Sequence, residues 1–275
     1  MNSWRLATLG FASDLLANDL EAAESFVFNG AYSEFVLGEW RSCMLWNTSG
    51  DIAEGHLSSN DHAARLTAYG AAMPYLRAMI ERTFRLDRLR FGRLARMMPN
   101  TVLVPHCDFL ELDRGLVRIH VPLATSRACL NAEEDWVFHM AEGEIWHLDA
   151  RRIHSAASTW DCARIHLILD FASCGGPEKT LRIDCTPRAT IPDDALVARP
   201  PLTPVEEASL MALGDVIDRF NHRDILAILI RKAFTRHMPL QSIFTWLAAM
   251  AERSGQADLI ETIERQRRYY TVARG

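Results

Sequence analysis

The alternation of apolar and polar residues predicts two β-strands with the same unusual pattern, at residues 116–123 and 164–171. Successive side chains of a strand point to opposite faces of the sheet. In the first strand, the letters RIH place Arg118 and His120 on one face, while valine and isoleucine take the other. The second strand repeats RIH from Arg164, with the same division. Each strand therefore combines an apolar face with a face that carries arginine and histidine.

Further short β-rich runs lie in the same region of the chain, between about residue 90 and residue 171. They are TVLV (101–104), WVFHM (136–140) and EIWHLD (144–149), and polar turns separate them. Several short strands without helices between them predict an antiparallel barrel or sandwich. The polar face has two interpretations at this point. It is the solvent-exposed face of an open sheet, or it lines a barrel that holds an anionic ligand.

Helical periodicity flanks this β region on both sides. Residues 62–84 have apolar side chains at helical spacing and predict a helix. Near the C-terminus, Thr203 and Pro204 are typical of a helix start, and the last seventy residues continue the pattern. We expect these helices to cap or pair with the β core rather than to carry the chemistry.

These patterns predict a mainly β fold class, an antiparallel barrel or sandwich with N-terminal helices and a C-terminal helical region. The expected domains are residues 1–175 for the β core with its N-terminal helical flank, and residues 205–275 for the helical domain. Residues 176–204 contain six of the 11 prolines and are expected to form a linker.

Composition narrows the class of protein. The chain has 275 residues, of which 49% are hydrophobic, enough for one large core with a helical annex. A net charge of −5 without a Lys/Arg run argues against nucleic acid and anionic membranes as partners. No apolar stretch approaches the ~18–20 residues of a membrane span, and six cysteines without a CxxC motif indicate a reducing compartment. We expect a cytoplasmic protein with a small-molecule ligand, and a homodimer through the C-terminal helices is possible.

The candidate chemistry lies in a His-x-Asp motif. A non-haem Fe(II) centre takes two imidazoles and one carboxylate and keeps open positions for substrate and oxygen. Residues i and i+2 of a strand project together, so His106 and Asp108, directly after TVLV, supply two ligands. His154 follows forty-eight residues later and is the candidate for the third ligand.

The motif alone is weakly specific, because the chain contains it three times. The copy at His222 lies in a helical stretch, where the side chains of residues i and i+2 are ~200° apart around the helix axis. It is therefore dismissed as a pair of metal ligands. The copy at His147 and Asp149 lies on a strand and is a real competitor, with His166 as its downstream partner.

Arg164 adds to the first of these sets. It lies ten residues after His154, on the next strand and on the polar face. A dicarboxylic cosubstrate that chelates a metal with one end needs a cation for the other, and arginine binds carboxylates in a bidentate manner. Two other interpretations stay open: a zinc hydrolase, because the same ligands can hold zinc, and a metal-free binding protein on a cupin-like barrel.

The chain also resembles a known family. The segments that carry the resemblance are PHCDFLELD (105–113), EEDWVFHMAEGEIWHLDARRIHSAA (133–157), RIHLILDF (164–171), AYSEFVLGEW (31–40), MPYLRAMIERTF (73–84), NHRDILAILI (221–230) and FTWL (244–247). Together they are similar to the bacterial cis-proline 4-hydroxylase family. That family belongs to the aspartyl/asparaginyl β-hydroxylase-like branch of the Fe(II)/2-oxoglutarate dioxygenases.

The resemblance implies that the β core is a double-stranded β-helix (jelly-roll, cupin-like). It also implies an enzyme that hydroxylates a free cyclic amino acid, L-proline or its homologue L-pipecolic acid, with Fe(II), 2-oxoglutarate and O2. It implies iron at His106, Asp108 and His154, and the distal cosubstrate carboxylate at Arg164. Arg118 matches a second arginine of the family's site and is expected to bind a carboxylate of the substrate or of the cosubstrate. The substrate pocket is expected to include Trp40 and Arg93.

Three departures from the family pattern leave the substrate open. His147 stands where the family has phenylalanine, Cys107 lies inside the His-x-Asp motif, and Phe109 replaces a tyrosine. The alternative function is an aspartyl/asparaginyl β-hydroxylase-type activity on a peptide or on a different free amino acid.

Overall fold

The structure is a computed structural model that describes residues 3–57, 61–110, 115–173, 175–185 and 190–274. Cys174, residues 111–113 of the segment PHCDFLELD, and residues 186–189 of the expected linker lie outside the described residues. The strands are β1 (Trp4–Thr8), β2 (Val36–Leu37), β3 (Trp40–Asn47), β4 (Arg65–Leu66), β5 (Leu89–Met97), β6 (Val102–Leu103), β7 (Leu116–Ala124), β8 (Cys129–Glu133), β9 (Trp136–Phe138), β10 (Glu144–Leu148), β11 (His154–Ser158) and β12 (Arg164–Ala172). The α-helices are α1 (Ser13–Ala22), α2 (Ala68–Ala71), α3 (Pro74–Thr83), α4 (Pro204–Met211), α5 (His222–Thr235), α6 (Ser242–Ser254) and α7 (Ala257–Thr271).

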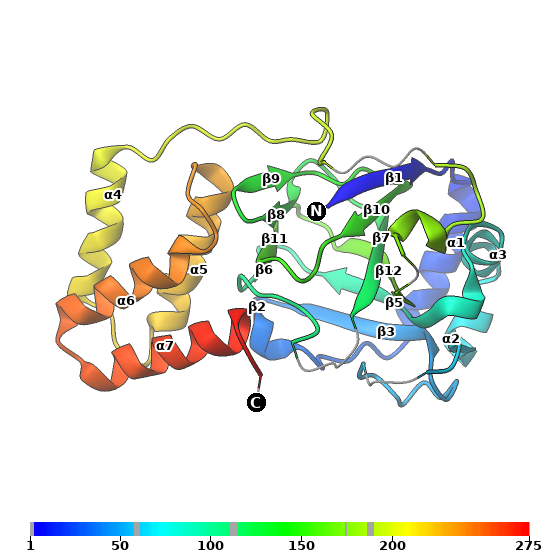
Figure 1. Cartoon of the computed structure of the whole chain (residues 1–275), viewed down its shortest axis with the longest axis horizontal. Helices are drawn as coiled ribbons and strands as arrows, with labels where there is room; N and C mark the ends of the chain where they lie inside the picture. The colour runs from blue at the N-terminus through cyan, green and yellow to red at the C-terminus, as the bar shows by residue number, and fades with distance from the viewer. Residues whose placement is uncertain (1–2, 58–60, 111–114, 174, 186–189, 275) are drawn as a thin grey trace.

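The strands of the described residues form two antiparallel sheets. The larger sheet has the order β1-β10-β7-β12-β5-β3-β4, and the smaller has the order β2-β6-β11-β8-β9. Figure 1 shows α1–α3 at one end of the molecule, the strands in the middle and α4–α7 at the other end. This is a double-stranded β-helix flanked by helices, so the predicted fold class is confirmed.

The larger sheet has one apolar face and one polar face, as the strand pattern predicts. Ile119 and Val121 of β7, with Leu167 and Leu169 of β12, belong to a core whose helical members come from α1 and α3. The alternate residues of the same strands line a cavity between the two sheets. The polar face is therefore the inner wall of the barrel, which decides between the two interpretations of the sequence pattern.

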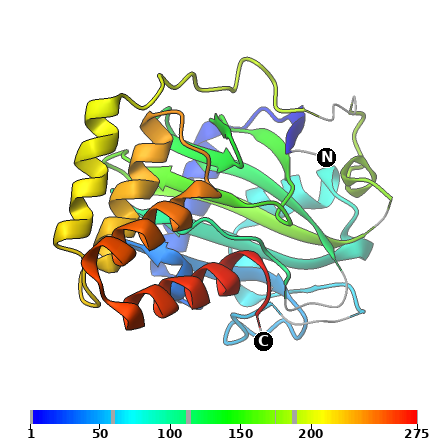
Figure 2. The ribbon, with the colours of Figure 1, turned by 60° about the vertical axis from the view of Figure 1, so that its left-hand side comes forward.

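The smaller sheet packs its outer face against the C-terminal helices (Figure 2). Val102 of β6 and Val104, directly after it, share one hydrophobic core with Leu229 and Ile230 of α5. α4 begins with a capping box, in which Thr203 and Glu206 satisfy each other's backbone N–H groups. The predicted helical C-terminal region is thus confirmed, and it supports the sheet that carries two of the candidate metal ligands.

The helix predicted over residues 62–84 is wrong in its first half. The chain forms β4 and the short helix α2 there, and the longer helix α3 begins only at Pro74. The residue before a proline is disfavoured in the α conformation, and Met73 has φ −117° and ψ 71°. Proline at the first position of α3 therefore starts a new helix.

The N-terminal strand β1 was not predicted. It pairs with β10 and buries Trp4 and Leu6 at alternate positions, which extends the larger sheet by one strand. In the described part of the chain, no helix has both the length and the apolar character that crossing a bilayer requires.

The shared core gives a test of how the helical region and the barrel are coupled. Leu229 is fully buried, so Leu229→Ala is expected to lower the free energy of unfolding by about 2–5 kcal/mol. Urea denaturation followed by both far-UV circular dichroism and tryptophan fluorescence should give one coincident transition. Leu15→Ala, at a position that is half exposed, is the control and should change little. Two separate transitions would contradict the coupling.

Candidate metal centre and cavity

His106 and His154 are brought together by the backbone. Each residue donates its N–H to the carbonyl of the other, at 3.0 and 2.9 Å between nitrogen and oxygen. This is the hydrogen-bonded pair of an antiparallel ladder, in which opposite side chains lie on the same face. The two imidazole centroids are accordingly only 4.4 Å apart. These two hydrogen bonds close a loop of the 47 residues that lie between the two histidines.

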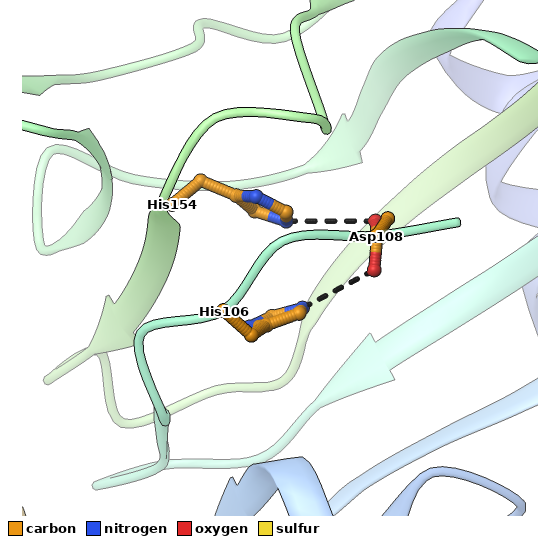
Figure 3. Close-up of side chains that lie close together, drawn as sticks. All are labelled: His106, Asp108 and His154. Carbon is orange, nitrogen blue, oxygen red and sulfur yellow. Dashed lines mark ion pairs between the residues drawn. The ribbon is translucent and has the colours of Figure 1, made fainter. Parts of the chain in front are cut away.

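Asp108 completes a three-residue cluster, as Figure 3 shows. Its Oδ1 lies 3.4 Å from Nε2 of His106, and its Oδ2 lies 3.5 Å from Nε2 of His154. One ligand atom from each residue lies within 4.8 Å of the others. Bonds of about 2.1 Å at right angles would place neighbouring ligand atoms about 3 Å apart. The spacing therefore fits one metal ion after a small contraction.

The tautomers of the two histidines also fit a metal. Nδ1 of His106 lies 2.7 Å from the carbonyl oxygen of Val104, and Nδ1 of His154 lies 3.0 Å from that of Arg152. Carbonyls only accept, so each Nδ1–H donates and each Nε2 keeps its lone pair. Both lone pairs are on the side of Asp108. Such hydrogen bonds to the second nitrogen are usual for metal-binding histidines.

The charge states suit a cationic ligand as well. Burial and the neighbouring imidazole of His106 lower the pKa of His154 to about 4, so this ring is neutral at pH 7. Burial, the largest single effect, would raise the pKa of Asp108, but Arg118 together with the neighbouring His106 and His154 outweighs it and holds that pKa well below its usual range. The cluster thus offers a neutral imidazole and an ionised carboxylate.

Arg118 holds the carboxylate of Asp108 from the larger sheet. Its Nη1 donates to Oδ2 of Asp108, and its Nε and Nη2 donate to the two oxygens of Asp170 at 2.7 and 2.9 Å. Arg118 and Asp170 are directly opposite in the pairing of β7 with β12. Both are buried. The predicted ligand-binding arginine is therefore engaged by two carboxylates of the protein itself.

The three clustered residues border a cavity of about 480 Å³ between the two sheets. That volume is in the range of small-molecule sites. All of the predicted site residues line it: Trp40, Arg93, His106, Asp108, Arg118, His154 and Arg164. The structure thus brings the whole predicted set to one cavity.

Arg164 is buried on the cavity wall. Its Nη2 donates to Oδ1 of Asn131 at 2.8 Å, and its Nε donates to Nε2 of His166 at 2.9 Å. Burial lowers its pKa to about 10, which leaves the guanidinium charged at pH 7. Burial and the nearby arginine charges hold the pKa values of His120 and His166 well below the usual range, so neither adds charge. Within the described residues, no carboxylate forms an ion pair with Arg164.

Arg93 is a second buried cation on this wall. Its Nε and Nη1 have no hydrogen-bond partner among the described residues, and its nearest ion pair is Asp170 at 4.0 Å. The guanidinium lies over the rings of Tyr32 and Trp40, at 5.4 and 5.9 Å from their centroids. The arrangement leaves donors available to a ligand carboxylate beside two aromatic rings.

The competing His-x-Asp motifs lie elsewhere. His147 packs edge-on against Trp4, with a centroid distance of 4.7 Å, and its Nδ1 lies 3.3 Å from the carbonyl oxygen of Arg118. His222 is the first residue of α5. Neither histidine belongs to the residues that line the cavity.

Several residues of the site were not among the predicted site residues. The strand alternation placed His120 on the polar face, and His166 was named only as a partner of His147; both line the cavity. Asp170 lies on the same face of the second RIH strand and pairs with Arg118. Tyr269 and Arg274 come from the end of the chain. No local pattern marks these two, because their position depends on how α7 packs.

The fold and this cavity define a class: a double-stranded β-helix protein with a candidate centre of two histidines and one carboxylate. The family model described as aspartyl/asparaginyl beta-hydroxylase matches residues 13–173, and the one described as L-proline 3-hydroxylase, C-terminal, matches residues 178–275.

Curated relatives match along nearly the whole chain. L-proline cis-4-hydroxylase of Rhizobium meliloti (strain 1021) is 34% identical over 270 residues, which cover 98% of this chain and 96% of the relative. L-proline cis-3-hydroxylase 1 of a Streptomyces species is 33% identical over 280 residues, covering 100% and 96%. A solved prolyl-4-hydroxylase of Pseudomonas putida is 15% identical, with a TM-score of 0.38 over 62% of this chain and 93% of that one, too loose a likeness to argue from. The chain belongs to the aspartyl/asparaginyl β-hydroxylase family, together with these proline cis-hydroxylases.

The buried ion pair between Arg118 and Asp170 gives a prediction for stability. Asp170→Asn removes the charge that balances a buried guanidinium, so we expect a loss of about 3–5 kcal/mol in the free energy of unfolding. The control is Asp215→Asn, which breaks a similar two-point pair with Arg253 at the surface. Exposed pairs contribute about 0–1 kcal/mol. Equal losses in the two variants, measured by urea denaturation, would contradict the importance given to the buried pair.

Proposed function

We propose that the protein is an Fe(II)/2-oxoglutarate-dependent hydroxylase of a free cyclic amino acid, L-proline or its homologue L-pipecolic acid. One observation carries the proposal: the His106, Asp108 and His154 cluster shares a cavity with Arg164, a buried cation without a carboxylate partner among the described residues. The names of the relatives, proline cis-4- and cis-3-hydroxylases, supply the substrate class.

His106, Asp108 and His154 would hold the ferrous ion, which supplies the redox chemistry of O2 activation with 2-oxoglutarate as the co-reductant. The protein's contribution is the preparation of the ligands. The Nδ1–H bonds to Val104 and Arg152 orient the two rings, and Arg118 fixes one oxygen of Asp108. The other oxygen stays available for the metal. Three protein ligands leave coordination positions for the cosubstrate and oxygen.

Arg164 is proposed to bind the distal carboxylate of 2-oxoglutarate. Asn131 and His166 already hold two of its N–H groups, so the guanidinium is oriented before the ligand arrives. A fixed planar donor costs less conformational entropy on binding than a free one. The neutral state of His120 and His166 leaves the charge of Arg164 for the ligand.

Arg93 and Trp40, with Tyr32, are proposed to bind the amino acid substrate. The unpartnered donors of Arg93 suit its carboxylate, and the aromatic rings suit an apolar ring. For Arg118 we propose a positioning role, because Asp108 and Asp170 occupy its donors. Its predicted contact with a substrate or cosubstrate carboxylate stays a prediction.

The choice between L-proline and L-pipecolic acid depends on one ring methylene, a difference of about 1–3 kcal/mol in a pocket. A preference of that size is within the reach of a few side chains. The departure at Phe109 bears on this preference, because Phe109 lines the cavity and its ring lies 4.7 Å from the Arg118 guanidinium.

Three further expectations, on location, oligomeric state and domain boundaries, belong with this proposal. We infer a cytoplasmic location, which the free thiols of the described cysteines support. Val216 and Phe220, in the connection that precedes α5, are exposed apolar side chains that a homodimer through the C-terminal region would bury. The division into a core domain, a linker and a helical domain at residues 175 and 205 stays a prediction.

The direct test is an anaerobically reconstituted iron assay with 2-oxoglutarate and O2. L-Proline, L-pipecolic acid and a panel of Asp- or Asn-containing peptides are offered in parallel, and the product is identified by NMR. We expect succinate formation to be coupled to hydroxylation of a free cyclic amino acid. Coupled turnover with the peptides alone would favour the alternative function, and hydrolysis by a zinc-loaded protein without O2 uptake would favour a hydrolase.

Asp108→Ala is expected to abolish this coupled turnover, since it removes a metal ligand. The loss should exceed the roughly 10- to 100-fold that follows from removing an outer-shell partner. Asp149→Ala, in the competing His-x-Asp motif, is the matched control and should keep most of the activity. The reverse result in the two variants would move the metal centre to the other motif.

Arg164→Lys is expected to raise the KM for 2-oxoglutarate about 10- to 100-fold, because lysine keeps the charge but loses the bidentate fork. The KM for the amino acid should change much less. The control is Arg96→Lys on β5, at a partly buried arginine that pairs with Glu24. An unchanged KM for 2-oxoglutarate in Arg164→Lys would refute the assignment of the distal carboxylate.

A further inference from the structure

The end of the chain returns to the candidate metal centre. Cys107 lies between the two ligand residues His106 and Asp108, and both of its backbone groups bond to the C-terminal segment. Its N–H donates to the carbonyl of Tyr270 at 2.9 Å, and its carbonyl accepts from Nη2 of Arg274. Figure 1 shows the red C-terminal segment descending beside the strands after α7.

A second contact joins the same segment to His106. The guanidinium of Arg274 lies over the ring of Phe35, 4.8 Å from its centroid, and the Phe35 ring lies 4.8 Å from the imidazole of His106. The hydroxyl of Tyr270 donates to the carbonyl of Glu34 at 2.8 Å, next to Phe35 in the chain. The C-terminal segment thus contacts the Phe35 ring, which lies against His106, through Arg274, and it contacts the neighbouring Glu34 through Tyr270.

These contacts matter because residues 104–109, the segment that contains His106 and Asp108, have little regular secondary structure. β6 ends at Leu103, and the only ladder pair of this segment in the described residues is that of His106 with His154. Phe109, one residue past the carboxylate, has a φ of 62°, a conformation that L-residues adopt rarely. The direction in which Asp108 projects relative to His106 depends on the peptide groups of Cys107 between them.

We propose that residues 269–274 position the metal ligands, with Arg274 as the positioning residue. Arg274 acts through the carbonyl of Cys107 and the ring of Phe35, and it does not contact the metal. The C-terminal helices would then be part of the active site rather than a cap outside it. The inference rests on the proposed function in one respect, that a divalent metal binds at His106, Asp108 and His154.

The test measures metal binding instead of turnover. Metal-free protein is titrated with Co(II), and the visible absorption bands of the bound ion give its Kd. We expect Arg274→Ala to raise the Kd about 10- to 100-fold, the usual effect of losing an outer-shell partner. Arg274→Lys keeps a cation but loses the planar fork, so its Kd should lie between those of Arg274→Ala and the wild type. Changed band positions in either variant would also support a distorted ligand set.

Arg267→Ala is the matched control. Arg267 lies on α7, its side chain is partly exposed, and its guanidinium pairs with Glu264, one turn away. Its Kd for Co(II) should equal that of the wild type. Thermal unfolding of the metal-free proteins should agree within a few degrees, and if Arg274→Ala fails to fold, Arg274→Lys alone carries the comparison.

The outcomes separate the two proposals. Wild-type Kd values and spectra in Arg274→Ala and Arg274→Lys would refute the positioning role and leave the proposed function intact. A wild-type protein that binds no Co(II) would refute the proposed metal centre, and the positioning role with it.

Discussion

The two backbone hydrogen bonds between His106 and His154 are the constraint on which the rest of the site depends. They fix two imidazoles on one face of the smaller sheet, at a distance that neither side chain could set alone. Asp108 follows from this pair, because it is two residues further along the same segment. The opposite wall of the cavity belongs to the larger sheet, so the distance between the sheets sets how far Arg164 lies from the cluster.

The buried arginines at the cavity are of two kinds: carboxylates of the protein neutralise one of them, and the other two have no two-point carboxylate partner among the described residues. Arg118 is matched by Asp170 and Asp108, a chain of ion pairs that crosses from the larger sheet to the metal ligand. Arg164 and Arg93 have no such two-point carboxylate partner among the described residues. A buried cation without a counter-ion costs stability unless a ligand supplies one. The interior is therefore built for anions, in agreement with a cosubstrate and a substrate that both carry carboxylates.

Much of the cavity lining could be predicted from the sequence, because the alternation of side chains along a strand depends only on the residues of that strand. It placed Arg118 and Arg164 on the cavity face before any contact was known. The partner of Arg118 could not be read in the same way, since Asp170 meets it only through the register between β7 and β12. The break before Pro74 was missed because apolar spacing ran through it. The arrival of Arg274 at Cys107 depends on the packing of four helices, and no short pattern encodes that.

The alternation of β12 also limits how this protein can change over evolutionary time. Its residues alternate between two environments: Ile165, Leu167, Leu169 and Phe171 belong to the core, and Arg164, His166 and Ile168 line the cavity. A substitution alters one of these environments and leaves the other in place. The loss or gain of a single residue within the strand would exchange the two faces downstream of it, burying charge in the core. Among relatives, the residue identities of this strand should therefore vary far more readily than its number of residues.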